Sequence, residues 1–470
     1  MADRAQTDFL GNPTTATGEV LAAVDGFVAG LIGYEERAVE VIRAARDHPG
    51  SCLLEVYAGM LWMLAETNRA PEIAATFVTR AEEAAPGANE RERMNLDLLR
   101  AWARADFDEA FEVALAIVET WPRDLAAMKI GQFLCFNRGR FERMLAIAEL
   151  GAPAAADVAQ LHGMLAFAYE ELHRLDEAEA CAREALRLKA DEPWAQHALA
   201  HVMLAQGRID EGAAFLEGAS GGWGGLNSFM LTHLWWHLAL FYLSQGRGAG
   251  DLVSLWDRQV WGVEKSFAQD QVGAVSLLAR LELAGADVGE RWSELGVHLA
   301  GRAEDAWEPF LSVQYLYGLG RAGREAEAQR LMAAIRARAA GAGPGAADPA
   351  WRQAALPLAE GLLAYLAGDP EAAADRFAAA KPRLQGIGGS HAQRDLFELI
   401  EIDALIRAGR LSQAREALEA RRSFDPGGVP LNRSLARVYG GLGLDTLAAA
   451  ADERVREALA RRGAASRSAA

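Results

Sequence analysis

YEELHRLDEAEACAREAL, residues 169–186, is the stretch that decides the fold class. It reads as the end of one apolar helix, a short turn, and a second helix with the small residue Ala178 near its second turn. A small residue at that point lets the two helices of a unit approach closely. Alanine, leucine, glutamate and arginine dominate the chain, and all four favour helices. The stretch therefore predicts a helix–turn–helix unit in an all-α protein.

Related phrases occur before and after this stretch, with a glycine and a charged or polar neighbour at the turn. Glycine suits the turn because the first helix ends in a left-handed residue. A spacing of about 34 to 39 residues between turns matches the tetratricopeptide repeat (TPR), so we expect a right-handed α-solenoid of stacked TPR-like units. The phrases are FNRGRFERMLAIAE (136–149), LAQGRIDEGAAFLEG (204–218), LSQGRGAGDLVSLWD (243–257), YGLGRAGREAEAQRLMAAI (317–335), YLAGDPEAAADRFAAA (365–380) and IRAGRLSQAREALEA (406–420).

The strength of the repeat signal divides the chain into parts. Residues 1–123 are predicted to form degenerate TPR-like helical pairs, and residues 124–338 carry the clearest repeats. A loop rich in glycine, proline and alanine at 339–350 precedes further repeats and a capping helix in 351–462. We expect residues 463–470 to form a disordered tail.

Composition and charge narrow the classes of partner. The chain has 470 residues and a formal net charge of −17. An acidic chain repels phosphate backbones, so we predict no nucleic-acid partner. There is neither a run of 18 apolar residues nor a signal peptide, which predicts a cytoplasmic protein without membrane contact. Cys52, Cys135 and Cys181 lie far apart, so we expect reduced core thiols.

Four of the nine histidines form two HxxxH pairs in successive units. QHALAHVMLAQGR (196–208) and THLWWHLALFYLSQGR (232–247) hold one pair each. Residues four apart share a helix face, and neighbouring helices pack about 8–10 Å apart, so four imidazoles can converge on the concave side of a solenoid. The expected lining of this concave groove is Trp194, His197, His201, His233, Trp236 and His237.

Three interpretations of these histidines stay open. They are polar residues satisfied by hydrogen bonds and stacked on indoles, or donors to a peptide or small-molecule ligand, or ligands of a transition metal such as Zn, Fe or Cu. Four histidines leave the charge of a cation uncompensated, and Asp270 in the next unit is the candidate carboxylate. With a metal, the simplest reaction is hydrolysis by metal-bound water, with His201 and His237 as candidate acid–base residues. The ligand, the metal and the oligomeric state stay open.

A further candidate lies in GIGGSHAQRDLFELI, residues 386–400. Ser390 is followed three residues later by Gln393, which is the spacing of a capping box and predicts the start of a helix. Gln393 and its neighbour Arg394 are also candidates for contact with a ligand.

Together these segments resemble the tetratricopeptide repeat protein 38 family. The resemblance covers most of the chain and implies a TPR-like fold with a site made of the two HxxxH pairs and their tryptophans. Trp223, in the insert between the pairs, also matches the family pattern. The resemblance implies no particular reaction. The segments that carry it are NPTTATGE (12–19), EPWAQHALAHVMLAQGRIDEG (192–212), HLWWHLALFYLSQGR (233–247) and GGSHAQRDLFELI (388–400).

The sequence departs from this family pattern in two places. Relatives carry an Asn-Asp and a histidine in the segment matching FLSVQYLYGLG (310–320), where this chain has Leu311, Ser312 and Gln314. Gly273 replaces a second acidic position near Asp270. If those family residues complete a metal or acid–base site, we expect that site to be altered in this chain.

Overall fold

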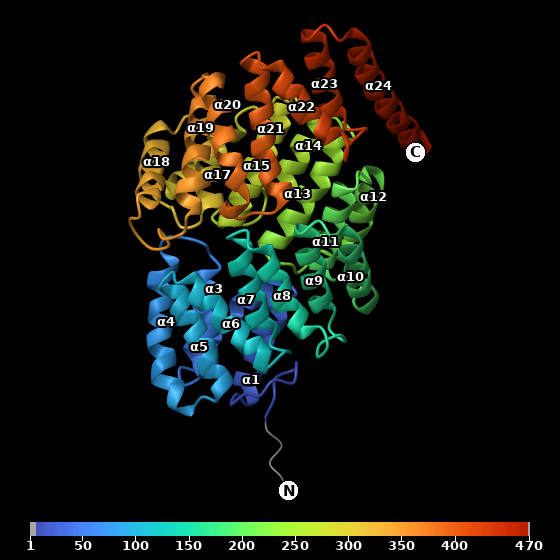
Figure 1. Cartoon of the computed structure of the whole chain (residues 1–470). Coiled ribbons are helices and arrows are strands. Elements are labelled where there is room, and N and C mark those ends of the chain that lie inside the picture. The colour runs from blue at the N-terminus through green and yellow to red at the C-terminus, as the bar shows by residue number, and fades with distance from the viewer. Residues whose placement is uncertain (1–5, 469–470) are drawn as a thin grey trace.

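The computed structural model describes residues 6–468, and in that range the chain forms 24 α-helices and no β-strand. Consecutive helices pack against each other along the array, as Figure 1 shows. The prediction of an all-α, TPR-like solenoid is confirmed. Its first twelve helices are α1 (Gly18–Ile32), α2 (Glu40–Asp47), α3 (Cys52–Met63), α4 (Ala70–Ala84), α5 (Glu90–Ala103), α6 (Phe107–Thr120), α7 (Leu125–Phe136), α8 (Phe141–Gly151), α9 (Ala159–Glu171), α10 (Leu175–Leu188), α11 (Pro193–Ala205) and α12 (Ile209–Ala219).

The second half of the array continues the same pattern of paired helices. It consists of α13 (Ser228–Ser244), α14 (Ala249–Leu255), α15 (Ala268–Leu283), α16 (Arg291–Leu299), α17 (Pro309–Arg321), α18 (Glu325–Ala339), α19 (Leu356–Leu366), α20 (Pro370–Ala380), α21 (His391–Arg407), α22 (Leu411–Arg422), α23 (Val429–Gly441) and α24 (Asp445–Ser468). Helix α24 extends beyond residue 463, where the sequence predicts a disordered tail, and residues 469–470 lie outside the described residues. None of the helices within 6–468 combines the length and apolar character needed to cross a bilayer.

The turns between paired helices are built largely as the sequence predicts. Gly207 after α11 and Gly246 after α13 have φ angles of 70° and 67°. A side chain is strained in this left-handed region, which is why glycine recurs there. In the stretch 169–186, His173 takes the same left-handed conformation, with φ of 55°, in place of a glycine.

Two hydrophobic cores meet in α13. The first runs from Leu10 to Phe241 and also includes Trp307, and the second runs from Trp236 to Ala451. Helix α13 therefore contributes side chains to both. The helix that carries one HxxxH pair is therefore packed on two sides. The division into three parts inferred from the repeat signal stays a prediction.

The array curves until loops of its second half contact loops of its first half, and Figure 1 shows the half with α17–α21 lying against the half with α3–α8. Gln385 Nε2 donates to the carbonyl oxygen of Gly139 at 2.7 Å, and the amide of Asn68 donates to Asp305 Oδ1 at 2.7 Å. The inner side of the solenoid is thus enclosed. The open concave groove expected from the sequence is an interior in the structure.

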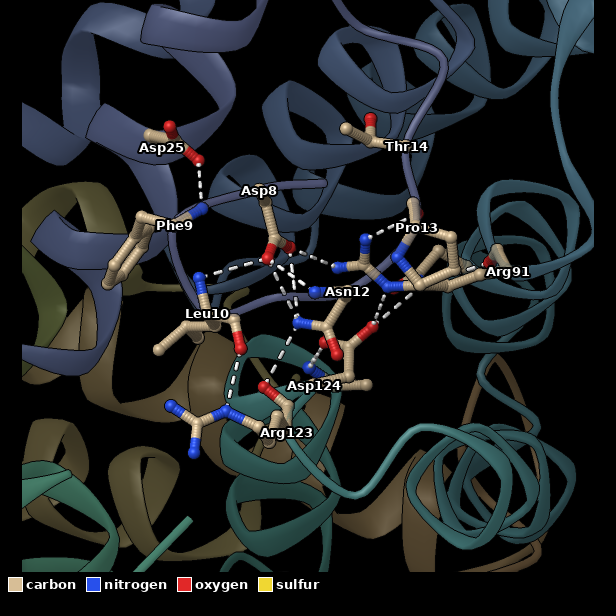
Figure 2. Close-up of polar contacts among 12 residues, drawn as sticks. Asp8, Phe9, Leu10, Asn12, Pro13, Thr14, Asp25, Arg91, Arg123 and Asp124 are labelled. Atoms are coloured by element: carbon tan, nitrogen blue, oxygen red, sulfur yellow. Dashed lines mark hydrogen bonds and ion pairs between the residues drawn. The ribbon is translucent and has the colours of Figure 1, made fainter. Parts of the chain in front are cut away.

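Buried charges fasten the N-terminal segment to this body (Figure 2). Arg91 on α5 is 1% exposed, and its Nε donates to Asp124 Oδ2 at 2.7 Å while its Nη2 lies 3.1 Å from Asp8 Oδ2. Arg123 Nε donates to the carbonyl oxygen of Leu10 at 2.7 Å. One buried guanidinium therefore joins the segment before α1 to the start of α7.

Candidate metal centre

Two capped helices place the four histidines. Glu192 caps α11 by accepting a hydrogen bond from the amide of Ala195, and Asn227 caps α13 by accepting one from Met230 at 2.9 Å. These caps fix where each helix begins and hence which face each HxxxH pair occupies. The two faces point at one another across the contact between α11 and α13.

The four imidazoles meet at their Nε2 atoms. His197 Nε2 lies 3.1 Å from His201 Nε2 and 3.1 Å from His233 Nε2, and His237 Nε2 lies 3.2 Å from His233 Nε2. A tetrahedral zinc ion with Zn–N bonds of about 2.0 Å separates its nitrogen ligands by about 3.3 Å. The convergence predicted from the two HxxxH pairs is present, and its spacing fits the ligands of one metal ion.

Aromatic rings hold two of these imidazoles in place. His197 stacks on Trp194 with ring centroids 4.4 Å apart, and His233 stacks between Trp236 at 5.2 Å and Phe229 at 5.1 Å. The planes are nearly parallel, at 18° for the first pair and 8° for the second. Stacking restricts ring rotation, so the Nε2 atoms stay aimed at a common centre.

Burial favours the neutral form of His197, His233 and His237. His201 and His237 have no exposed surface, and His197 and His233 are 1% and 8% exposed. Burial lowers the pKa of His233 to about 3 and, together with the neighbouring imidazoles, lowers the pKa of His197 and His237 well below 6.5. Neutral imidazole is the form that ligates a metal.

A carboxylate lies behind the cluster, at a position that the sequence analysis did not single out. Glu170, at the end of α9, has Oε2 3.2 Å from His201 Nδ1 and Oε1 3.1 Å from His391 Nε2. Histidines that bind metals usually have a carboxylate or carbonyl at the second ring nitrogen. Glu170 and His391 both lie within stretches quoted above, but no motif links residues so far apart in the chain.

His391 is held between two glutamates. Its Nδ1 lies 3.6 Å from Glu171 Oε1, and its backbone amide donates to the same oxygen at 3.2 Å. Burial disfavours the imidazolium, but Glu170 and Glu171 raise the pKa of His391 to about 9. Burial likewise acts to raise the pKa of Glu171, but His391 and Arg394 lower it overall.

Two predicted site residues have other partners. Asp270 accepts hydrogen bonds from Ser228 and from Thr232 Oγ1, the latter at 3.3 Å, and burial raises its pKa to about 6. Trp223 is buried, and its Nε1 donates to Gln196 Oε1 at 2.9 Å. The carboxylate beside the histidines is therefore Glu170, whereas Asp270 is held by hydroxyl groups.

The capping box at α21 is confirmed. Ser390 Oγ accepts from the amide of Gln393 at 3.2 Å, and Gln393 Oε1 accepts from the amide of Ser390 at 2.9 Å. Arg394 extends toward the buried glutamates, with Nη2 3.7 Å from Glu171 Oε2. The box thus fixes the start of α21, the helix that brings His391 to the cluster.

Two cavities flank the centre. A cavity of about 360 Å³ reaches the cluster at His197 and His233. Lys129 Nζ lies over two aromatic rings that line this cavity, 4.1 Å from the centroid of Trp194 and 4.2 Å from that of Tyr34. A second cavity, of about 620 Å³, reaches His391 from the other side. The aromatic wall of the smaller cavity includes Tyr34, Trp62, Phe133, Phe136, Phe167, Trp194, Phe229 and Phe267.

No protein-family model matches the chain. Among solved structures, the human IFIT1 dimer with m7Gppp-AAAA is similar over 93% of this chain and 99% of that chain, with 13% identity and a TM-score of 0.41. The human IFIT1 dimer with PPP-AAAA covers 89% and 94%, with 15% identity and a TM-score of 0.39. Naa15/Naa10 bound to HypK-THB covers 93% and 62%, with 13% identity and a TM-score of 0.25. These likenesses concern the helical fold.

The exclusion of nucleic acid as a partner, predicted from net charge, is wrong. The IFIT1 structures that resemble this chain hold m7Gppp-AAAA or PPP-AAAA. A net charge of −17 sums over the whole chain, whereas a bound molecule meets only the charges of the site that holds it. Acidic composition is therefore no ground for excluding this class of partner.

Proposed function

We propose that this protein is a metal-binding, TPR-like solenoid with a ligand cavity beside its metal. Three Nε2–Nε2 contacts of 3.1–3.2 Å, which link the four histidines in a row, carry the proposal. The four ligand atoms all lie within 4.8 Å of one another. Imidazole donors suit Zn, Cu, Fe and Ni among the first-row metals. The metal ligands would be His197, His201, His233 and His237.

Charge compensation supports this assignment. Four neutral imidazoles bring no negative charge to a divalent cation, which counts against a metal when the sequence is read alone. Glu170 lies 3.2 Å behind His201, and Glu171 follows it on the same helix. Two buried carboxylates next to the cluster offset the charge of the cation.

The adjacent cavity favours a small organic ligand over a peptide. Its wall is mostly aromatic and apolar, with Lys129 and Glu66 as its ionisable residues besides the two histidines. Its volume of about 360 Å³ lies within the range of small-molecule sites. A bound molecule would lie against His197 and His233, two of the proposed metal ligands. A peptide needs a long open groove, which the closed solenoid does not offer.

Hydrolysis with His201 and His237 as acid and base is a less favoured alternative. Neither side chain has exposed surface, and neither lines the small cavity. The Nε2 atoms of both rings face the other imidazoles. Such enclosed nitrogens suit metal ligation better than proton exchange with a substrate.

The resemblance to the tetratricopeptide repeat protein 38 family points to the same residues. Its pattern of a tryptophan, an HxxxH pair and a second HxxxH pair covers Trp194 and Trp236 together with the four histidines that converge here. Membership in that family is part of this proposal, because no family model matches the chain.

Metal titration of untagged protein tests the proposal. After dialysis against a chelator, the protein should bind at least about one equivalent of Zn²⁺, measured by elemental analysis after gel filtration. His237→Gln keeps the side-chain volume but removes a ligand, and should weaken Zn²⁺ binding about tenfold or more. His162→Gln, at a half-buried histidine on α9 whose ring contacts the carbonyl oxygen of Ala156, should leave binding unchanged.

Two results would overturn the metal proposal. One is wild-type protein that retains less than about a tenth of an equivalent of Zn²⁺, Cu²⁺ or Fe²⁺. The other is His237→Gln protein, shown to be folded by circular dichroism, that binds Zn²⁺ as tightly as the wild type. The first result needs no variant, so it stands even where His237→Gln fails to fold.

A further inference from the structure

We propose that a second divalent cation binds behind the histidine cluster, between Glu170, Glu171 and His391, and that His201 bridges the two metals. The inference rests on the proposed four-histidine site, because His201 belongs to both sites. The protein would then hold two metals, one in the four-histidine site and one in a site with both carboxylate and imidazole ligands.

The distances bring four ligand atoms to one place. Glu170 lies 3.1 Å from His391 Nε2 through Oε1 and 3.2 Å from His201 Nδ1 through Oε2. Glu171 Oε1 lies 3.6 Å from His391 Nδ1. One ligand atom from each of the four residues can be chosen so that all lie within 4.8 Å of one another.

Hydrogen bonds within the protein leave this cluster unsatisfied. Both carboxylate oxygens of Glu170, Oε2 of Glu171 and the Nδ1 atoms of His201 and His391 are buried and make no hydrogen bond of good geometry. Their contacts to one another and to Arg394 are ion-pair contacts at 3.1–3.7 Å. The side chains of both glutamates are 0% exposed. Buried carboxylates without hydrogen bonds are costly and need an explanation. A cation ligated by these oxygens supplies one.

His201 presents one nitrogen to each site. Its Nε2 lies 3.1 Å from His197 Nε2, and its Nδ1 lies 3.2 Å from Glu170 Oε2. To bridge two metals, the His201 ring gives up its remaining N–H proton to solvent and binds one cation through each nitrogen. His391, which its two glutamates favour as the imidazolium, likewise releases one proton when it ligates the second cation. The step changes no oxidation state, and the two carboxylates together with the His201 imidazolate offset part of the charge of the two cations.

The donor set and the access route define the cation. Carboxylate and imidazole donors together suit Zn²⁺, Mn²⁺ or Fe²⁺. The cavity of about 620 Å³ reaches His391 and Arg394, so an ion can arrive there without passing the four-histidine cluster. The competing interpretation is that Glu170 and His391 only orient His201 through an ion-pair chain.

Counting bound Zn²⁺ separates the two interpretations. Chelator-treated, untagged full-length protein is loaded with Zn²⁺, passed through gel filtration and analysed for zinc. We expect about two equivalents in the wild type and about one in Glu171→Gln, whose Oε1 can still accept from the His391 amide. Glu177→Gln, an exposed glutamate on α10 paired with Arg174, is the matched control and should keep about two.

Copper tests the bridge itself. With Cu²⁺ in both sites, the spins couple through the His201 ring, so the electron paramagnetic resonance signal per copper should be weaker in the wild type than in Glu171→Gln. One equivalent of zinc in both proteins would overturn the second site and leave the four-histidine site standing. No bound zinc in either would overturn both. Two equivalents with uncoupled Cu²⁺ spins would refute the bridging role of His201.

Discussion

At the scale of a single residue, the interior of the protein changes the pKa of the Lys129 amine. The side chain is 9% exposed, and its ammonium nitrogen lies over the rings of Trp194 and Tyr34. Burial lowers the pKa of Lys129 to about 7, although Glu192 acts in the opposite direction. A large fraction of the molecules therefore carry an uncharged amine at this cavity at neutral pH.

Replacing Lys129 with methionine should reveal how much the burial of its amine lowers the free energy of unfolding. Between pH 7 and 10.5 the unfolded chain binds a proton at Lys129 that the folded protein does not, so wild-type stability rises with pH across this range. Lys129→Met should be more stable than the wild type by at least about 2 kcal/mol at pH 7, and the difference should shrink toward pH 10.5. Urea denaturation from pH 7 to 10 measures it. Lys189→Met, at a partly exposed lysine near Asp191, is the control and should show no such pH-dependent difference in stability. A Lys129→Met difference that does not change with pH would contradict the prediction.

Sequence reasoning found half of the site at this scale. The spacing of the HxxxH pairs predicted His197, His201, His233 and His237 because a helix places residues four apart on one face. Their carboxylate partner was missed. In the sequence, Glu170 looks like an ordinary acidic residue of a helix, and His391 like the residue after a capping serine. Only the folded structure shows that they lie in contact beside the histidines.

At the scale of the elements, helix ends were predictable where local chemistry sets them. The glycines after α11 and α13 and the capping box of α21 follow from backbone sterics and hydrogen bonding over a few residues. His173 was not predictable as a left-handed residue, because a glycine marks this turn in the neighbouring units and the stretch 169–186 contains none.

The attachment of the N-terminal segment to α5 and α7 gives a prediction about elements. Arg91→Ala leaves Asp8 and Asp124 buried without their guanidinium, so it should lower the free energy of unfolding by about 3–5 kcal/mol. Arg104→Ala removes an exposed pair with Glu109 and should cost at most about 1 kcal/mol. Chemical denaturation compares them, and equal small losses would show that the buried pair does not fasten the segment.

At the scale of the whole molecule, the repeat pattern predicted stacking but not closure. A period of helix pairs reports how each unit packs on the next, whereas the total curvature accumulates from small rotations at every interface. The contact between Glu171 and His391 spans 220 residues of sequence. This closure turns the expected open groove into an interior and brings α21 against α9 and α11.

The proposed metal binds at the point where the four Nε2 atoms meet. Crystals of untagged protein soaked in Zn²⁺, with diffraction recorded on both sides of the zinc absorption edge, show whether zinc occupies this point. We expect an anomalous peak bonded to the Nε2 atoms of all four histidines at about 2.0–2.1 Å. Zinc peaks at other places in the crystal, with no peak at this point and with hydrogen bonds joining the four nitrogens, would overturn the metal site.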